Sequence, residues 1–420
     1  MVSLTTEICV LCEGYIRDNI KAMSSPNFET DLLQNVFDLL KQQLPMIDSD
    51  KAETQLKYNI NYALNKFVYV FYVPRRSNLY INKKPPSRTV IKRLRKQIEY
   101  LENIEQPEQR TEEWYLYRKN RITASDAWKC VGSDAAKNRF IVEKCTPIEM
   151  PDISARTVVK KSYERTDTPF HHGKRYEPLS VLYYEYIYNT RVGEFGCIPH
   201  PEYKFIAASP DGINIDETSP LYGRMLEIKN IVNREINGNP KLEYWIQMQM
   251  QMETCELNEC DFLETRFKAY ESEHEFEIDG TFQKTNEEKY KGIILHFIGD
   301  GAPHYEYCPF NATRAEFETW EQEMREKNSD KEWFENIYWY LDEVSCVVVM
   351  RNKSWFNSIL PEMTETWNSV IHDRKHGCEH RRSTRTKRKN QEDISGNEIK
   401  QAKLTATGRI SLFNIDSLNE

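Results

Sequence analysis

Two carboxylates and one lysine are spaced so that neighbouring strands would bring them together. Asp211 follows a strand-like run at residues 205–208. Glu227 comes sixteen residues later in a second strand-like run, with Lys229 two positions further on. Because alternate residues of a strand share a face, Glu227 and Lys229 would point the same way while Ile228 faces the core. Pairing of the two strands would place Asp211 beside Glu227.

This trio has the chemical equipment to hydrolyse a phosphodiester. Two facing carboxylates repel each other unless a cation lies between them, and their oxygens suit Mg²⁺ or Mn²⁺. A lysine beside such a cation can position or deprotonate an attacking water. Asp-Gly is also a common turn pair, and Glu-x-Lys is frequent on solvated strands. The trio alone therefore leaves the ordinary structural interpretation open.

Glu177 is a third acidic candidate. It precedes Pro178 and a run with helical spacing that includes Leu179, Leu182 and Tyr183. This pattern predicts that Glu177 stands at the start of a helix. An acid in that position could contribute to a metal site, or it could simply stabilise the helix N-terminus.

The alternating Gln and Met residues at 247–252 fit a strand by their period and a helix by what precedes them. Asn239-Pro240 resembles an N-cap followed by proline at the first helical position, which favours the helix. Such a helix would pack Trp245, Met248 and Met252 into the core. Its other face would carry Tyr244, Gln247 and Gln251.

Arg118 and Ser125 form a candidate anion site upstream of these blocks. A cation, a hydroxyl and nearby helix N–H groups together make a phosphate pocket. The same residues also fit a serine N-cap beside surface arginines, which is the more common arrangement.

Taken in order, these blocks resemble the lambda exonuclease-like branch of the PD-(D/E)XK nucleases, and the whole chain resembles the baculovirus alkaline nucleases. Five ordered blocks, which span residues 114–252, are far more specific than any one of them. The blocks are Arg118 with Ser125, Glu177, Ser209-Pro210-Asp211-Gly212, Leu226-Glu227-Ile228-Lys229 and Gln247.

The resemblance implies a catalytic set of five residues. Asp211 and Glu227 would hold Mg²⁺, with Mn²⁺ as a substitute, and Glu177 would bind a metal directly or through water. Lys229 would activate the attacking water. Gln247 would orient Lys229 or the substrate.

The remaining implied contacts involve the backbone and the substrate. The Ile228 carbonyl would be a further metal ligand, and Arg118 and Ser125 would bind the 5′-phosphate of a DNA end. Pro178 directly follows Glu177 and constrains the backbone there, which is a departure from the family pattern.

The activity implied is that of an alkaline deoxyribonuclease, a 5′→3′ exonuclease on double-stranded DNA with endonuclease action on single strands. Its setting would be viral DNA recombination, replication and genome maturation in the host nucleus, beside a viral single-strand DNA-binding protein. The alternative is a catalytically inactive DNA-binding or scaffold protein on the same fold. An RNA-directed nuclease shares the D…E-x-K chemistry, but Arg118 and Ser125 favour a DNA end. The number of subunits is left open.

The predicted fold is α/β with a helical N-terminal extension, and the resemblance implies a PD-(D/E)XK restriction endonuclease-like core, a mixed central sheet flanked by helices. We expect a mostly helical region with a basic stretch at 1–105, the nuclease domain at 106–373 and a basic, flexible tail at 374–420. Within them, strand patterns fall at 67–73, 290–298 and 337–350, and helix patterns at 313–327 and 355–372.

Charge is segregated along the chain, so the net charge of −8 does not exclude a nucleic-acid partner. Residues 253–290 carry twelve acidic and four basic side chains, a balance of −8 that leaves the remainder near neutral. Residues 74–96 hold nine Lys or Arg and no acid, and residues 374–389 hold eight and one acid. Either basic stretch could track a DNA backbone or be merely solvated.

The ten cysteines are irregularly spaced and predict a reducing compartment rather than a disulfide framework. The longest strongly apolar stretch has seven residues, far short of the about 20 that a membrane helix needs, so no membrane partner is expected. Four residues near the C-terminal end are spaced for a metal but adjoin basic residues, which leaves zinc and a solvated basic tail both open. They are His372, His376, Cys378 and His380.

Overall fold

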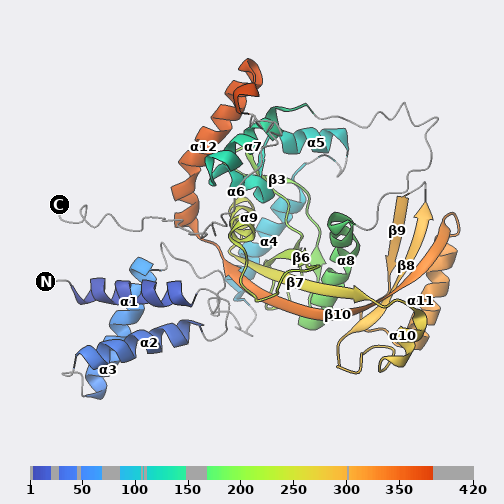
Figure 1. Ribbon diagram of the computed structural model, residues 1–420, viewed down its shortest axis with the longest axis horizontal. Helices are drawn as coiled ribbons and strands as arrows, with labels where there is room; N and C mark the ends of the chain where they lie inside the picture. The colour runs from blue at the N-terminus through green and yellow to red at the C-terminus, as the bar shows by residue number, and fades with distance from the viewer. Residues whose placement is uncertain are drawn as a thin grey trace, which may run out of the picture.

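A curled mixed sheet flanked by helices forms the body of the protein, and a small group of helices lies at its N-terminal end in the computed structural model (Figure 1). The predicted α/β fold class and helical N-terminal region are therefore confirmed. The structure describes residues 3–19, 28–44, 49–68, 86–105, 107, 111–147, 168–299 and 302–381.

The N-terminal helices share one apolar cluster. Their apolar stripes face one another, and Ile16, Leu32 and Leu40 are fully buried between them. The prediction of a strand at 67–73 is wrong for Phe67 and Val68, which belong to a helical turn. Residues 69–73 lie outside the described residues. The elements are α1 (Leu4–Asp18), α2 (Phe28–Gln43), α3 (Asp50–Ala63) and the π-helical turn η2 (Leu64–Val68).

Helix α4 (Arg88–Glu102) packs with the sheet-bearing body rather than with α1 to α3. Ile98 and Leu101 lie in the same apolar cluster as the strands. Arg95 makes two 2.5 Å hydrogen bonds to the Glu217 carboxylate. The predicted domain boundary at residue 105 therefore differs from the packing, which groups the helix from Arg88 onward with the sheet-bearing body.

The main sheet has seven strands in the order β2-β5-β6-β7-β10-β8-β9. All neighbours are antiparallel except β6 and β7, which are parallel and therefore need a crossover connection. Strands β8 and β10 confirm the predicted strands. The strands are β2 (Val192–Gly193), β5 (Gly212–Asn214), β6 (Met225–Asn230), β7 (Glu259–Ala269), β8 (Lys291–Gly299), β9 (Ala302–Tyr307) and β10 (Glu332–Met350).

Two helices cover the faces of the β6–β7 pair. Helix α8 (Pro169–Tyr188) packs Tyr184 and Leu179 in one cluster with Leu226 and Ile228. Helix α9 (Leu242–Thr254), the crossover between β6 and β7, packs its methionines in another cluster with Met225 and Phe262. Successive residues of β6 therefore face different helices, as the period of a strand requires.

The predicted helix with Trp245, Met248 and Met252 in the core is confirmed, but its predicted start is wrong. Helix α9 begins at Leu242, after Lys241, and not at Pro240. Lys241 makes no side-chain cap hydrogen bond, so Asn239-Pro240 belongs to the preceding connection.

A three-stranded sheet and several helices complete the body. The order of the small sheet is β1-β4-β3, with β1 and β4 parallel and β3 and β4 antiparallel. Its strands are β1 (Ile122–Thr123), β3 (Ile198–Pro199) and β4 (Ile206–Ala208). The accompanying helices are α5 (Glu112–Lys119), η3 (Ala124–Asp126), α6 (Ala127–Cys130), α7 (Asp134–Cys145), α10 (Glu273–Ile278) and α11 (Arg314–Lys327).

Helix α12 (Lys353–His376) and the turn η5 (Glu379–Arg381) close the described chain. Residue 374, the predicted start of the tail, lies inside α12, and Arg374 hydrogen-bonds the carbonyl oxygens of Lys119 and Lys144. The packed body therefore continues to Arg381. Across the described residues, the helices lack the length and apolar character that a membrane span requires.

Candidate active site

Strand pairing places Asp211 next to Glu227, as the sequence predicts. Strands β5 and β6 are antiparallel with Gly212 opposite Leu226, so the position before Gly212 lies opposite the position after Leu226. The Ile228 backbone N–H donates a 2.6 Å hydrogen bond to Asp211 Oδ2, which fixes that carboxylate against β6. The two acids thus meet although they are sixteen positions apart in the chain.

The alternation of β6 separates the polar site from the core. Glu227 is completely buried, and its Oε1 forms an ion pair with Lys229 Nζ. Ile228 points into the opposite cluster beneath α8. Glu227 and Lys229 therefore share a face, which confirms the predicted arrangement of these three residues.

The electrostatics of the pair favour a cation. Burial and then the adjacent Glu227 carboxylate raise the pKa of Asp211 well above its usual value. Burial alone would lower the pKa of Lys229, but the Glu227 and Asp211 carboxylates outweigh it and raise that pKa. One lysine thus faces two acids, of which Glu227 is fully buried, and additional positive charge would stabilise the cluster.

Gln251 hydrogen-bonds the second carboxylate oxygen of Glu227. It is not among the site residues predicted from the sequence. Its Nε2 donates to Glu227 Oε2 at 2.6 Å and to the Ser209 carbonyl oxygen at 3.1 Å. Its Oε1 is buried and has no hydrogen-bond partner in the described part of the chain. Gln247 lies one turn earlier in α9 and is half-buried, and the role predicted for it stays a prediction.

Glu177 does not stand at the start of a helix, which corrects the sequence interpretation. Helix α8 begins at Pro169, with the Thr168 hydroxyl as its N-cap, so Glu177 lies in the middle of the helix. Pro178 is accommodated inside the helix and does not begin it. Glu177 is exposed, but it is close enough to Asp211 to help raise the pKa of that carboxyl.

Arg118 reaches the same site from α5. Its Nη1 donates a 3.3 Å hydrogen bond to the hydroxyl of Ser209, and its guanidinium lies 4.7 Å from the ring centre of Trp114. Ser209 also accepts the bond from Gln251, so one chain of contacts links Arg118 to Glu227.

Ser125 occupies the turn η3 between β1 and α6. Its side chain is exposed, and its hydroxyl lies 3.3 Å from the Thr123 hydroxyl. The turn packs against α9, which carries Gln251. Arg118 and Ser125 are thus both attached to elements that border the carboxylate pair.

The candidate zinc residues lie at the end of α12 and in the turn after it. His372 and His380 both approach the Asp373 carboxylate, at 3.1 Å and 3.7 Å. His376 bonds the His372 carbonyl oxygen, while Cys378 is buried. Among the residues that the structure describes, no group of three or more His, Cys, Asp or Glu side chains is arranged to hold a metal.

The candidate active site lies within a segment of the chain that matches a known protein-family model. Residues 113–258 match the family model of the YqaJ-like viral recombinase domain. Every predicted site residue and Gln251 fall within that segment. The match supports the predicted lambda exonuclease-like family in its coarse form, and the narrower resemblance to baculovirus alkaline nucleases stays a prediction.

The relatives found cover parts of the chain. An uncharacterized protein of Acanthamoeba polyphaga mimivirus is 31% identical over 320 residues, which are 66% of this chain and 55% of that protein. The chain thus spans about half the length of this relative. The crystal structure of an alkaline exonuclease from Laribacter hongkongensis covers 63% of this chain and 95% of its own, at 17% identity and a TM-score of 0.36. Its complex with dAMP gives 18% identity and a TM-score of 0.35.

Proposed function

We propose that this protein is a metal-dependent deoxyribonuclease that degrades duplex DNA from 5′-phosphorylated ends in the 5′→3′ direction. The observation that carries the proposal is the meeting of the half-buried Asp211 and the fully buried Glu227 with Lys229 at one face of β6. The match of residues 113–258 to a viral recombinase domain supports it. Endonuclease action on single strands belongs to the same proposal, because the same groups can hydrolyse an internal phosphodiester.

The donor set fits Mg²⁺ or Mn²⁺. Asp211 and Glu227 would hold the ion together with the Ile228 carbonyl. Glu177 does not form a three-acid group with them in the structure, so it would act through one of the waters that fill the other positions, as is usual for Mg²⁺. Burial and then the Glu227 carboxylate raise the pKa of Asp211, and a cation between the two carboxylates would relieve their repulsion. A bound Mg²⁺ supplies charge stabilisation at the phosphate and lowers the pKa of a water.

The side chains around the carboxylates position the reacting groups. Lys229, paired with Glu227 and 5.1 Å from the ring centre of Tyr244, can donate a hydrogen bond to the attacking water or to a phosphate oxygen. Gln251 fixes the other oxygen of Glu227 and keeps its orientation. These contacts pre-organise charge where the transition state needs it.

Recognition of the DNA end falls to Arg118 and Ser125. Arginine has five N–H donors in a planar fork, and the contact with Ser209 uses one of them. The remaining donors suit a terminal phosphate, which carries more negative charge than an internal one. The exposed Ser125 hydroxyl can add a neutral hydrogen bond.

The proposed setting is viral DNA recombination, replication and genome maturation, in the host nucleus and with a viral single-strand DNA-binding protein as partner. The mimivirus relative and the recombinase domain support a viral recombination role. A catalytically inactive DNA-binding protein is the competing proposal, and it predicts binding without turnover.

The test is digestion of linear duplex DNA labelled at either end, with 5′-phosphate and 5′-hydroxyl versions, in Mg²⁺ or EDTA. We expect Mg²⁺-dependent loss from the 5′ end that is faster with the phosphate. Cleavage that ignores the phosphate would reject the Arg118 and Ser125 pocket. DNA binding without any cleavage would support the inactive protein.

A further inference from the structure

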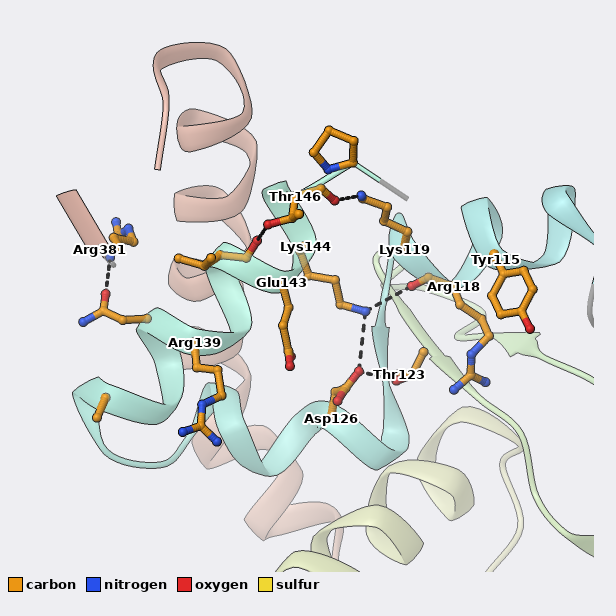
Figure 2. Close-up of a pocket in the computed structure, with 14 residues that line it drawn as sticks. Tyr115, Arg118, Lys119, Thr123, Asp126, Arg139, Glu143, Lys144, Thr146 and Arg381 are labelled. Carbon is orange, nitrogen blue, oxygen red and sulfur yellow. Dashed lines mark hydrogen bonds and ion pairs between the residues drawn. The ribbon is translucent and has the colours of Figure 1, made fainter. Parts of the chain in front are cut away.

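A large cavity opens beside Arg118, between α5, η3, α7 and the turn after α12 (Figure 2). Its volume is about 1090 Å³. Small-molecule sites usually have about 300–1000 Å³, so a single terminal phosphate would fill only a small part of this space. The cavity therefore has room for more of the substrate than the phosphate that Arg118 would hold.

The lining of the cavity is strongly cationic. Five cationic side chains and only two acidic ones, Asp126 and Glu143, line it. Lys129 pairs with both acids, at 2.9 Å and 2.8 Å, and the buried Lys144 lies 3.6 Å from Asp126. The cations are Arg118, Lys119, Arg139, Lys144 and Arg381.

The two acids are thus neutralised within the wall. Burial alone would raise the pKa of Asp126, but its contacts with Lys129 and Lys144 hold that pKa below its usual value, so Asp126 stays ionised and paired. Arg139 is exposed and has no ion-pair partner in the described ranges of the chain. Figure 2 places Arg118 and Arg139 on either side of Asp126 and Glu143. Arg381 pairs with Asp373, so the positive charge left over in the lining is that of Arg118, Lys119 and Arg139.

An aromatic ring lies among these cations. Tyr115 lines the cavity with 43% of its surface exposed, and its ring meets that of Trp114 edge-on at 5.0 Å. Positive charge together with an accessible aromatic face is the combination that binds single-stranded nucleic acid, with phosphates on the cations and bases on the ring. A duplex would not fit this use, because its bases are already stacked.

We propose that this cavity binds the nucleotides of a single-stranded 5′ extension at a DNA end. The inference rests on the proposed function, because Arg118 both lines the cavity and belongs to the site proposed for the terminal phosphate. When the 5′ strand continues past the duplex, Arg118 contacts an internal phosphate and the extra nucleotides enter the cavity. Arg139 and Lys119 then contact their phosphates, and Tyr115 stacks on a base. The enzyme accordingly accepts 5′-extended ends as well as blunt ones.

The test compares two fluorescent DNA hairpins by anisotropy in EDTA, so that no cleavage occurs. One hairpin is blunt, and the other carries a 5′ extension of about six nucleotides, within the span of a typical single-strand site. We expect the full chain to bind the extended hairpin at least about fivefold more tightly. Arg139→Glu and Tyr115→Ala should each weaken binding of the extended hairpin about tenfold and leave blunt binding within about twofold.

Two controls make the result specific. Tyr115→Phe keeps the aromatic face and should retain binding of the extended hairpin. Lys353→Glu makes a comparable charge reversal at the exposed first residue of α12, at the end opposite to η5, and should change neither affinity.

The outcomes separate this inference from the proposed function. Equal affinity of the wild type for the two hairpins, or equal weakening of both by Arg139→Glu and Tyr115→Ala, would overturn the extension site. Blunt-duplex cleavage in Mg²⁺ is measured on the same proteins. If the wild type cleaves nothing but the binding differences appear, the proposed function fails and the extension site stands.

Discussion

Two polar clusters lie beneath different helices of the same strand pair. Each sets one cation against two carboxylates, but the clusters differ in whether that cation contacts both acids. In the cluster that contacts α8, Asp261 on β7 accepts a 2.7 Å hydrogen bond from the Tyr184 hydroxyl. The guanidinium of Arg224 lies 3.3 Å and 3.4 Å from its two oxygens. Arg224 also bonds Glu259 at 3.0 Å, and Asn214 donates to Tyr184. Each oxygen of Asp261 has a donor.

The cluster beneath α9 is left incomplete. Asp211 has a backbone N–H and faces the Glu227 carboxylate, whose partners are Lys229 and Gln251. In the first, or balanced, cluster Arg224 contacts both acids, whereas in the second, or unbalanced, cluster no described cation lies within ion-pair distance of Asp211. The balanced cluster holds strands together, and the unbalanced one keeps two carboxylates whose repulsion a cation would relieve. Burial alone therefore does not identify a functional site; a carboxylate such as Asp211, which no described cation contacts, is the better indication.

The largest expected effect is on the balanced cluster. Arg224→Met leaves Asp261 buried without its cation, so the free energy of unfolding should fall by about 3–5 kcal/mol. Urea denaturation of the wild type and of Arg224→Met measures this difference in the free energy of unfolding. The DNA cleavage rate per folded molecule should stay within about twofold, because Arg224 contacts none of the proposed catalytic residues. A loss of cleavage without a loss of stability would break the comparison.

The next effect is on the unbalanced cluster. Lys229→Met removes the positioned charge, and the cleavage rate should fall about 10²–10³-fold, as when other preorganised donors are removed. Single-turnover digestion of duplex DNA measures it, with thermal melting to confirm folding. Lys268→Met, at the exposed end of β7, is the control that should cleave at the normal rate. A Lys229→Met rate within about threefold of wild type would contradict the assignment.

A smaller effect distinguishes the two glutamines of α9. Gln251→Met removes a hydrogen bond to a buried carboxylate, worth about 1.5–3 kcal/mol, so cleavage should slow about 10–100-fold. The Mg²⁺ concentration for half-maximal rate should also rise, because Glu227 is less well oriented. Gln247→Met should change both quantities by less than about threefold. The reverse order would restore Gln247 as the orienting residue.

The smallest effect concerns the metal itself. Mg²⁺ at about ten times its dissociation constant should raise the free energy of unfolding by about 1.4 kcal/mol, because it binds the folded carboxylate pair. Asp211→Asn should abolish this increment, and Asp261→Asn should keep it. Thermal melts with and without EDTA measure the difference. Equal stabilisation of all three proteins would place the metal elsewhere.

The features that follow from the local spacing of apolar and polar residues were predictable from the sequence. The alternation of β6 assigned Glu227 and Lys229 to one face and Ile228 to the other, and short-range strand pairing brought Asp211 to them. The long strand β10 and the helix α11 behind its Thr313 cap also follow from local patterns. Such features depend on residues close in sequence, which a pattern can register.

The errors have a local and a tertiary origin. The sequence pattern places Glu177 at a helix start, but the stronger local indication is Thr168 followed by Pro169, a cap with proline in the first turn. Gln251 was noted as sharing a face with Gln247, yet the pattern could not tell which turn of α9 reaches Glu227. Packing of α4 on the sheet body depends on contacts distant in sequence, such as that between Gln97 and the Cys255 carbonyl.

The most direct test of the central claim compares two conservative substitutions on the neighbouring clusters. Single-turnover cleavage of a 5′-phosphorylated duplex is measured in Mg²⁺ for the wild type, Asp211→Asn and Asp261→Asn. Thermal melting establishes the folded fraction of each. We predict that Asp211→Asn is folded and at least about 10³-fold slower, because it loses a metal-holding carboxylate. Asp261→Asn should be less stable but normally active once folded. Wild-type cleavage by folded Asp211→Asn would contradict the account.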